Sequence, residues 1–496
     1  MKVDASARPL GSGHAARGLG LREAVRRHGP FALLLLAAAL PRLVAMAGYP
    51  SMLWFGDSGT YLRSALDAVP SALRPSGYPV MLWMLRPLHD FGAVAFVQHV
   101  FGLAVGVLLY LVSYRAARAA WPDRDVLPGL LGCLAAALPL LDAYQIELEH
   151  LVLSDTLFEV LLVGAVAALL WRAGPSWTSA LVAGLLLGAA AVTRTVGIPL
   201  IVIALLFLLV RRAGWRPVAA LAASFVILLG SYAAWYRAEN GRWGLTGTNG
   251  LFLFGRVAAF ADCGKIHPPA DERVFCRDWK HDRRGMDPAF AAMWGAHAPF
   301  RTFREGITDP DGNARAGDFA KRAVLAQPLD YLRTVLVDTA RGFAPHRTNR
   351  PTAGTVAEYR FPAYYKRPVT AVKASDRYGG STAKPRVVEP YARWIRAYQH
   401  VVFVRGPMLA LILLVGAAGV VRRWRGAAVL PLLTGVALIV VPAATADFDY
   451  RYLLPAVPML CLAAVLGWIP ETRRCRTAEG DSRPEPGPPG PGLPGA

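Results

Sequence analysis

Long apolar segments alternate with polar segments along most of the chain. Several of the apolar segments, if helical, are about as long as the hydrocarbon core of a bilayer is thick. We therefore predict an all-α polytopic membrane protein with about ten transmembrane helices. The predicted spans are residues 31–48, 92–113, 126–142, 155–171, 178–193, 196–210, 217–236, 401–421, 427–443 and 452–469.

The polar segments divide the chain into five parts. Residues 1–30 form a charged N-terminal tail, and 31–236 form a membrane module with seven predicted spans. A long polar region, 237–400, separates the seventh span from the eighth, and 401–469 hold the last three spans. The tail 470–496 is rich in Pro and Gly, a composition typical of disorder.

Short helices are predicted inside the polar parts as well. Prolines divide the first loop, 49–91, into short pieces, and two of these, 58–69 and 80–88, have the character of helices lying at a membrane surface. In the long polar region, apolar residues at helical spacing predict helices at 314–325 and 329–343.

Composition agrees with a membrane protein. Hydrophobic residues make up 54% of the 496 residues, and charged residues only 18%, against about 25% in ordinary soluble domains. The net charge of +20 raises the question of nucleic acid. The basic residues are scattered through loops without a stacking platform or a known binding motif, so we exclude a nucleic-acid partner.

The distribution of basic residues predicts the orientation in the membrane. The predicted inside segments carry 20 Lys and Arg residues, whereas the short outside loops carry 5. Because positive residues concentrate on the cytoplasmic side, both termini are predicted to be cytoplasmic, with 49–91 and 237–400 extracytoplasmic. Abundant Ala, Arg, Gly and Pro with few Lys is typical of a GC-rich bacterial genome, which indicates a bacterial cell membrane.

Two of the five cysteines lie in the same long loop. Cys263 and Cys276 are 13 residues apart in the region predicted to be outside the cytosol, where disulfides form. We predict a disulfide between them, and the alternative is two unpaired thiols.

Asp57 is the first candidate for chemistry. It follows the first span within Trp54-Phe55-Gly56-Asp57-Ser58, among aromatic residues and glycines. A carboxylate near hydrocarbon is unfavourable unless it has a partner or a function. Asp57 is either a catalytic carboxylate or the N-cap of the helix that begins at Ser58.

Three arginines in outside loops are candidates for binding phosphate. Arg74 stands before a Ser-Gly turn with Tyr78 beside it, Arg194 separates two apolar runs, and Arg451 lies among tyrosines. The planar guanidinium group binds two phosphate oxygens at once. The structural alternative is that these arginines extend to the membrane interface, with the tyrosines as aromatic anchors.

The second outside loop is acidic and has no Lys or Arg. Glu149 and His150 stand beside an apolar run, which indicates a metal, a sugar hydroxyl or a distant arginine as their partner. Ser154 suits an N-cap and Asp155 the first turn of the next helix, so Asp155 has a structural interpretation as well as a catalytic one. Together the outside loops make a polar face of mixed charge over an apolar bundle, which suits an enzyme or a transporter.

Four short motifs carry a resemblance to a known family. They are Gly56-Asp57-Ser58-Gly59-Thr60-Tyr61, Ser76-Gly77-Tyr78-Pro79, Glu149-His150-Leu151-Val152-Leu153-Ser154-Asp155, and Thr193-Arg194 with Tyr450-Arg451-Tyr452-Leu453-Leu454-Pro455. With these motifs the membrane part resembles the GT-C superfamily of integral membrane glycosyltransferases. Within it, the resemblance is to the dolichyl-phosphate-mannose–protein mannosyltransferases and the bacterial lipid-carrier-dependent aminoarabinose transferases.

The resemblance implies transfer of a sugar from a polyprenyl-phosphate donor at the outer face of the membrane. Asp57 would be the general base of an inverting reaction, and Arg74, Tyr78, Arg194 and Arg451 would bind the donor phosphate. Glu149, His150 and Asp155 would bind the acceptor (a glycan, lipid or protein) or a cation.

The metal dependence of such a reaction is left open by the sequence. Many members of the family carry a second carboxylate in the first loop, whereas here Ser58 follows Asp57. A divalent cation is therefore neither required nor excluded. The alternative function is a transporter or flippase of a lipid-linked saccharide, for which charges and broken helices near the membrane midplane would be expected.

Overall fold

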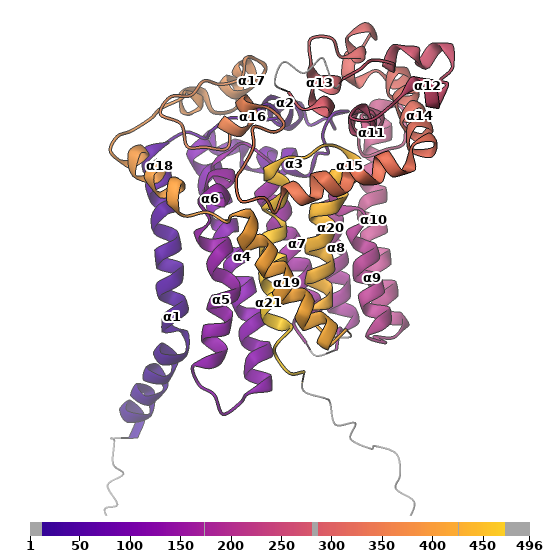
Figure 1. Cartoon of the computed structure of the whole chain (residues 1–496). Coiled ribbons are helices and arrows are strands. Elements are labelled where there is room, and N and C mark those ends of the chain that lie inside the picture. Colours follow the sequence, from indigo (N-terminus) through magenta and orange to yellow (C-terminus); the bar gives the residue numbers. More distant parts are fainter. Residues whose placement is uncertain (1–11, 173, 280–285, 425, 472–496) are drawn as a thin grey trace, which may run out of the picture.

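The computed structural model describes residues 12–172, 174–279, 286–424 and 426–471. The regular structure in these ranges is helical, apart from one isolated parallel bridge between Leu53 and Leu151. Figure 1 shows a bundle of long helices below a layer of shorter helices and loops at one end. We call this end the polar end; it carries the first loop and most of 237–400.

The bundle helices coincide with the predicted spans. They are α1 (Ser12–Gly48), α4 (Phe91–Ala120), α5 (Leu127–Leu141), α7 (Asp155–Leu170), α8 (Trp177–Thr193), α9 (Leu200–Val210), α10 (Trp215–Asn240), α19 (Gly406–Arg422), α20 (Val429–Thr445) and α21 (Ala456–Leu466). Helix α1 begins well before the predicted start at residue 31. The tail beyond 471 and residues 1–11 lie outside the described residues.

The predicted count of ten full spans is not confirmed. Among the described residues, three helical segments are long and apolar enough to cross a membrane: Glu23–Gly48, Phe91–Ala120 and Trp215–Asn240. Two helix pairs, α5 with α6 (Ala143–His150) and α18 (Tyr391–Val401) with α19, pass the same test together but are bent by 56°. Counting each pair as one span gives up to five, and the further apolar helices are shorter.

The layer at the polar end is built from short helices. In the first loop these are α2 (Ser58–Asp67), α3 (Gly77–Leu85) and η1 (Arg86–Leu88), close to the ranges predicted. At the outer turns of the bundle are η2 (Thr195–Gly197) and η7 (Tyr450–Leu453). The long polar region adds α11 (Asn249–Ala258), α12 (Cys263–Ile266), η3 (Ala270–Phe275), α13 (Pro288–Trp294), η4 (Pro299–Thr302), η5 (Gly306–Thr308), α14 (Pro310–Ala326), α15 (Pro328–Arg341), α16 (Ala353–Ala357), α17 (Val369–Gly379) and η6 (Gly380–Ala383).

Backbone pairing joins the first loop to the second. The Leu53 N–H donates to the His150 carbonyl oxygen at 2.9 Å, and the Val152 N–H donates to the Leu53 carbonyl oxygen at 3.1 Å. The Ser58 hydroxyl adds a bond to the Val152 carbonyl oxygen at 3.0 Å. These bonds hold the start of α2 beside the start of α7, although α3, α4, α5 and α6 lie between them in the chain.

The long polar region packs over the first loop through close backbone contact. A Cβ atom on Gly59 of α2 would lie 2.6 Å from the Thr370 carbonyl oxygen of α17, so only glycine permits this approach. The apolar side chains of α2 and α17 belong to one buried cluster with those of α18. The first loop is therefore covered by protein rather than open to solvent.

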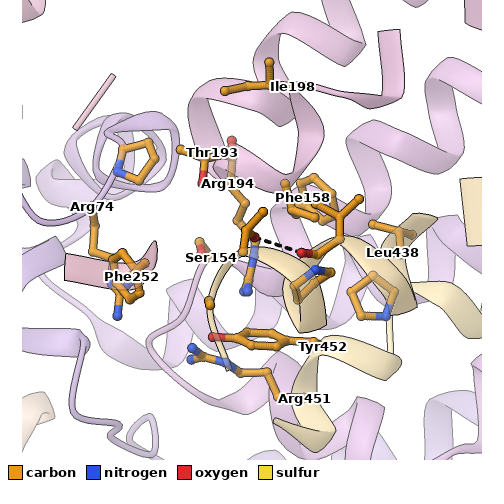
Figure 2. Close-up of a pocket in the computed structure, with 18 of the residues that line it drawn as sticks. Arg74, Ser154, Phe158, Thr193, Arg194, Ile198, Phe252, Leu438, Arg451 and Tyr452 are labelled. Carbon is orange, nitrogen blue, oxygen red and sulfur yellow. Dashed lines mark hydrogen bonds between the residues drawn. The ribbon is translucent and has the colours of Figure 1, made fainter. Parts of the chain in front are cut away.

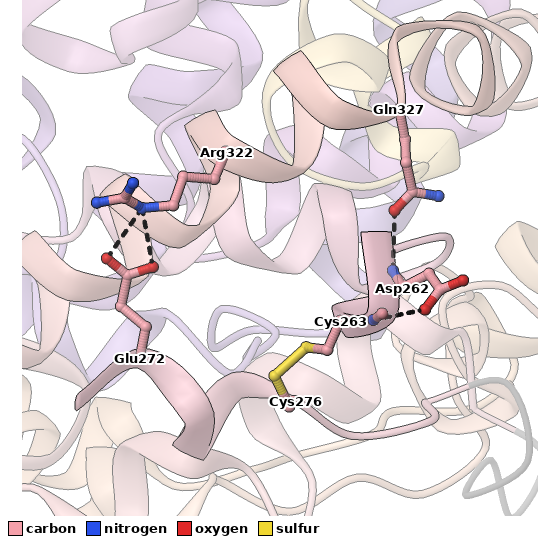
Figure 3. The surroundings of a disulfide bond; sticks show 7 residues. Asp262, Cys263, Glu272, Cys276, Arg322 and Gln327 are labelled. Carbon is pink, nitrogen blue, oxygen red and sulfur yellow. Dashed lines mark hydrogen bonds and ion pairs between the residues drawn. A yellow bond between two sulfur atoms is a disulfide. The ribbon is translucent and has the colours of Figure 1, made fainter. Parts of the chain in front are cut away.

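A second module of the polar end carries the predicted disulfide. Cys263 and Cys276 are bonded, with their Cα atoms 5.9 Å apart. Figure 3 shows the neighbouring contacts, in which Gln327 accepts from the Asp262 N–H at 2.9 Å and Arg322 pairs with Glu272 at 3.3 Å. A separate cluster of buried apolar residues between Leu251 and Ala323, rich in phenylalanine, forms the core of this module.

Candidate functional site

A cavity of about 580 Å³ lies where the bundle meets the layer at the polar end. Its walls come from the first loop, α7, the turn after α8, α11, α20 and η7. Figure 2 shows Arg74, Arg194 and Arg451, from three distant segments, around this space. Asp57 lines the same cavity, so the structure brings together four of the residues named from the sequence.

The Asp57 carboxylate is paired with arginines and does not cap a helix. It occupies the N-cap position of α2, but its side chain makes no capping hydrogen bond. Instead, one carboxylate oxygen accepts from Arg74 Nη2 at 2.9 Å, and the other lies 3.6 Å from Arg451 Nη1. The structural alternative for Asp57, an ordinary helix cap, is therefore wrong, since the ion pairs occupy the carboxylate.

These ion pairs control the charge of Asp57. Burial would raise the pKa of the carboxyl group, because a charge is unfavourable away from water. The attraction of Arg74 and Arg451 outweighs burial, so the pKa of Asp57 is lowered below its ordinary value. Asp57 is therefore a carboxylate at neutral pH, held between two positive groups.

Each arginine is oriented by an aromatic ring beside it. The Arg74 guanidinium lies 5.2 Å from the Phe252 ring centroid, and that of Arg451 lies 4.7 Å from the Phe55 ring centroid. Contacts of this kind hold a guanidinium group by its face and leave the N–H edges free. The Nε atoms of Arg74 and Arg451 are buried and have no hydrogen-bond acceptor in the described part of the chain.

Arg194 and Asp155 form the third ion pair of the cavity. Arg194 follows the last residue of α8 and pairs with the fully buried Asp155 in the first turn of α7. Ser154, next to it, shares a 3.0 Å hydrogen bond with the Tyr61 hydroxyl of α2. Ser154 makes no capping bond, so the structure gives this residue a role in joining α2 to α7.

The remainder of the wall is apolar. Phe158, Ile198, Leu438, Val441 and Pro442 line it, and they belong to bundle helices or the turns between them. The cavity thus has a charged part at the polar end and an apolar part beside the bundle. This shape suits a ligand with an anionic head and a hydrocarbon tail.

Glu149 and His150 do not line this cavity. The Glu149 carboxylate binds Arg42 of α1 through two bonds of 2.8 and 2.7 Å, and it also lies 2.8 Å from His99 Nδ1. His150 Nδ1 lies 3.0 Å from His99 Nε2, and His150 Nε2 lies 2.8 Å from the Tyr49 carbonyl oxygen. The partner of Glu149 is therefore a distant arginine, the third of the partners considered from the sequence, whereas His150 contacts His99 and the Tyr49 carbonyl oxygen.

Tyr78 is also removed from the cavity. Its side chain is fully buried, and its ring packs edge-on against Tyr61 at 5.1 Å between centroids. Its hydroxyl has no hydrogen-bond partner among the described residues. The ring of Tyr78 supports Tyr61 from behind, and Tyr61 in turn lines the cavity.

Within the described ranges, no group of three or more His, Cys, Asp or Glu side chains is placed to hold a metal ion. Asp57, which lines the cavity, and Asp155, beside it, are paired with arginines.

Sequence reasoning did not identify Glu358 of the long polar region. This residue follows α16, and its carboxyl group interacts with the Gly56 N–H. Although much of Glu358 is exposed, loss of solvation where it meets the first loop and then the repulsion of Asp57 raise its pKa to about 7, against the lowering effect of the Gly56 N–H. No local motif marks Glu358, so only the packing of the polar end reveals it as a neighbour of Asp57.

Comparison with solved structures identifies similar chains. One is ArnT from Cupriavidus metallidurans bound to undecaprenyl phosphate, with 15% identity over 88% of this chain and 78% of that chain, and a TM-score of 0.34. The apo state of the same protein matches with a TM-score of 0.33 at the same identity and coverage. The Archaeoglobus fulgidus oligosaccharyltransferase in the apo form matches at 12% identity over 87% of this chain and 49% of that chain, with a TM-score of 0.37.

Protein-family models and curated proteins include no match to this sequence. With TM-scores below 0.5, these likenesses carry no statement about function, which must come from the cavity and its residues.

Proposed function

We propose that this chain is a membrane glycosyltransferase that transfers a sugar from a polyprenyl-phosphate donor to an acceptor at the outer face of the membrane. One observation carries the proposal. A single cavity has a carboxylate between arginines at one end and an apolar wall along the bundle at the other. A donor of this class has the matching chemistry: a polyprenyl chain, a phosphate and a sugar.

The arginines provide the site for the donor phosphate. Arg74 and Arg451 have unused Nε donors, and Arg194 is the third positive group of the cavity. Charge-assisted hydrogen bonds from such donors are stronger than neutral ones and strengthen further as the leaving phosphate gains charge. The polyprenyl chain then lies along Phe158, Ile198 and Leu438.

Asp57 is the general base in this mechanism. It accepts the proton of the acceptor hydroxyl while that oxygen attacks the anomeric carbon. The bond from this carbon to the phosphate oxygen breaks, and its electron pair stays on the phosphate. Attack on the face opposite the leaving group inverts the anomeric configuration.

Donor binding also changes the basicity of Asp57. In the empty cavity the arginines lower the pKa of Asp57, which makes it a weak base. A donor phosphate competes with the carboxylate for Arg74 and Arg451. The pKa of Asp57 then rises toward its value in the absence of these partners, and the carboxylate becomes a better proton acceptor only when the donor is present.

The test compares two carboxylates of the same helix region. Asp57→Asn keeps the size of the side chain but removes the base, so release of undecaprenyl phosphate from an undecaprenyl-phosphate-linked sugar should fall about 10²–10⁴-fold. Asp67→Asn, at the exposed end of α2, serves as the matched control and should leave turnover unchanged. Undecaprenyl phosphate itself should still bind to the Asp57→Asn protein in native mass spectrometry.

Two results would count against the proposal. Equal turnover of the Asp57→Asn and Asp67→Asn proteins would remove Asp57 from the reaction. Movement of the lipid-linked sugar across proteoliposome membranes without release of undecaprenyl phosphate would instead support the alternative function, a transporter or flippase.

A further inference from the structure

A second cavity, of about 440 Å³, lies on the other side of η7 from the first. Arg451 and Tyr452 of this turn face the first cavity, whereas Tyr450 and Leu453 face the second. The two cavities therefore share a wall but have separate linings. Neither the proposed donor site nor the residues named from the sequence account for the second cavity.

The charged side chains that line the second cavity are all basic. His346, Arg347, Arg360 and Arg405 line it, and its lining contains no carboxylate. None of these four side chains forms an ion pair within the described part of the chain. Three guanidinium groups around one space, without ion-pair partners, repel one another unless an anion joins them.

Arg347 is held in place by aromatic rings rather than by an acid. Its guanidinium carbon lies 3.8 Å from the Tyr144 ring centroid, 5.2 Å from that of Tyr450 and 5.6 Å from that of Phe403. These contacts use the faces of the guanidinium group and leave its N–H donors for another ligand. The group is thus positioned in advance, which reduces the entropy lost on binding.

Two buried carboxylates near Arg347 do not satisfy it. Asp142 and Glu147 interact with Arg347 electrostatically, but neither lies within ion-pair distance. The oxygens of Asp142 already accept hydrogen bonds from the backbone N–H groups of Tyr144, Gln145 and Val404. Arg347 therefore retains its donors for a group inside the cavity.

The lower part of the second cavity is apolar and adjoins the membrane-facing bundle. Leu409 of α19 and Leu454 and Val457 near α21 line it. Helix α19 begins at this cavity with Gly406, where a Cβ atom would lie 2.2 Å from the Ala344 carbonyl oxygen. Farther along α19, Leu411 and Leu414 are exposed apolar residues of the kind that contact hydrocarbon in a membrane.

We propose that the second cavity binds the phosphate ester of an anionic lipid, with the head group among the arginines and an acyl chain along α19 and α21. Three features support this ligand: basic residues without partners, a guanidinium group fixed by rings, and an apolar floor at the membrane end. The inference does not depend on the reaction proposed for Asp57, because the second cavity does not include that residue.

The test measures lipid retention by the full-length protein in nanodiscs made of phosphatidylglycerol and phosphatidylcholine. After mild extraction, native mass spectrometry should detect phosphatidylglycerol bound in preference to phosphatidylcholine. Arg360→Gln combined with Arg405→Gln should reduce this retention at least about tenfold, because two charge-assisted contacts are lost. Both residues are exposed, so this variant should fold normally, and Arg347→Gln provides an independent second variant.

Arg393→Gln is the matched control. Arg393 is exposed on α18 at the same end of the molecule but does not line the cavity. The Arg393→Gln protein should retain phosphatidylglycerol as the unmodified protein does. The Asp57→Asn protein should do the same. Equal retention of the two lipids, or equal retention by the Arg360/Arg405 variant and the Arg393 control, would overturn the proposal.

A competition experiment with a soluble compound distinguishes a lipid head group from a free phosphate ester as the ligand of this cavity. Glycerol 3-phosphate carries the same phosphate ester without acyl chains, so it should displace phosphatidylglycerol only weakly if the apolar floor contributes. Binding of glycerol 3-phosphate without any preference for phosphatidylglycerol would overturn the lipid assignment.

Discussion

Asp447 and Asp449 lie two residues apart in the loop after α20, and their carboxyl groups have different surroundings. Asp449 accepts a hydrogen bond from the Tyr359 hydroxyl at 2.5 Å and lies 4.0 Å from Arg451 Nε. Asp447 has no hydrogen-bond or ion-pair partner of this kind among the described residues. Burial, followed by the repulsion of Asp449, raises the pKa of Asp447 to about 7. Asp447 therefore carries a proton in the folded protein at pH values where an exposed aspartate is ionised.

This shifted pKa predicts that stability decreases as the pH rises. The folded protein holds the Asp447 proton up to about pH 7, whereas the unfolded chain loses it near its ordinary pKa of 3.8. Below pH 3.8 the Asp447 proton contributes fully to the free energy of unfolding. This contribution is lost as the pH rises through about 7. The thermal midpoint of the purified protein should therefore fall between about pH 5 and pH 8.

Asp447→Asn should make the dependence of the thermal midpoint on pH shallower, because Asn does not titrate. Asp67→Asn, an exposed carboxylate outside this loop, should keep the slope of the unmodified protein. Identical slopes for the Asp447 and Asp67 variants would show that another group controls the pH dependence.

At the scale of the elements, one buried ion pair ties α1 to α6. Arg42 donates two hydrogen bonds to the Glu149 carboxylate, at 2.8 and 2.7 Å. It donates two more, each at 2.8 Å, to the carbonyl oxygens of Ala38 and Leu140. Both charged side chains are almost completely buried. A charge left without its partner in such surroundings is highly unfavourable, so the pair makes the position of α1 depend on α6.

Arg42→Gln should therefore lower the free energy of unfolding by about 3–5 kcal/mol, because it leaves the Glu149 charge uncompensated. The double variant Arg42→Gln with Glu149→Gln should lose less than the single variant. SDS denaturation of the purified protein in mixed micelles measures both. Arg26→Gln, exposed on the same helix, is the control and should have little effect. A double variant less stable than Arg42→Gln would contradict this account of the pair.

At the scale of the whole molecule, the first cavity lies between bodies with separate apolar cores. The bundle has one core, the first loop shares another with α17 and α18, and the disulfide module has a third. Asp57 belongs to the first loop, whereas Phe252, beside Arg74, belongs to the disulfide module. The geometry of the site therefore depends on how these bodies pack together.

Removal of the disulfide tests this dependence. Cys263→Ser with Cys276→Ser opens a loop of 13 residues, which should destabilise the disulfide module by about 3 kcal/mol. Hydrogen exchange should increase in α11 and α14, whereas α4 and α7 in the bundle should stay protected. Uniform exchange changes across all four helices would mean that the module and the bundle unfold as one unit.

The bundle helices could be predicted from the sequence because each depends on a local property. A run of apolar residues such as 92–113 forms a helix in a membrane whatever the remainder of the chain does. The short helices at 58–69 and 314–325 follow from local spacing in the same way, and the disulfide follows from two cysteines in one loop. Spans were harder to count, since bends such as that between α5 and α6 depend on packing at the polar end.

The site itself required contacts between segments far apart in the chain. Local sequence marked Asp57 as unusual, but its partner Arg451 is contributed by a loop near the other end of the chain. Local sequence likewise grouped Glu149 and His150 with the site, whereas folding pairs Glu149 with Arg42 inside the bundle. The energy of a buried charge depends on which opposite charge reaches it, and that is settled when the helices pack, not by the neighbours in sequence.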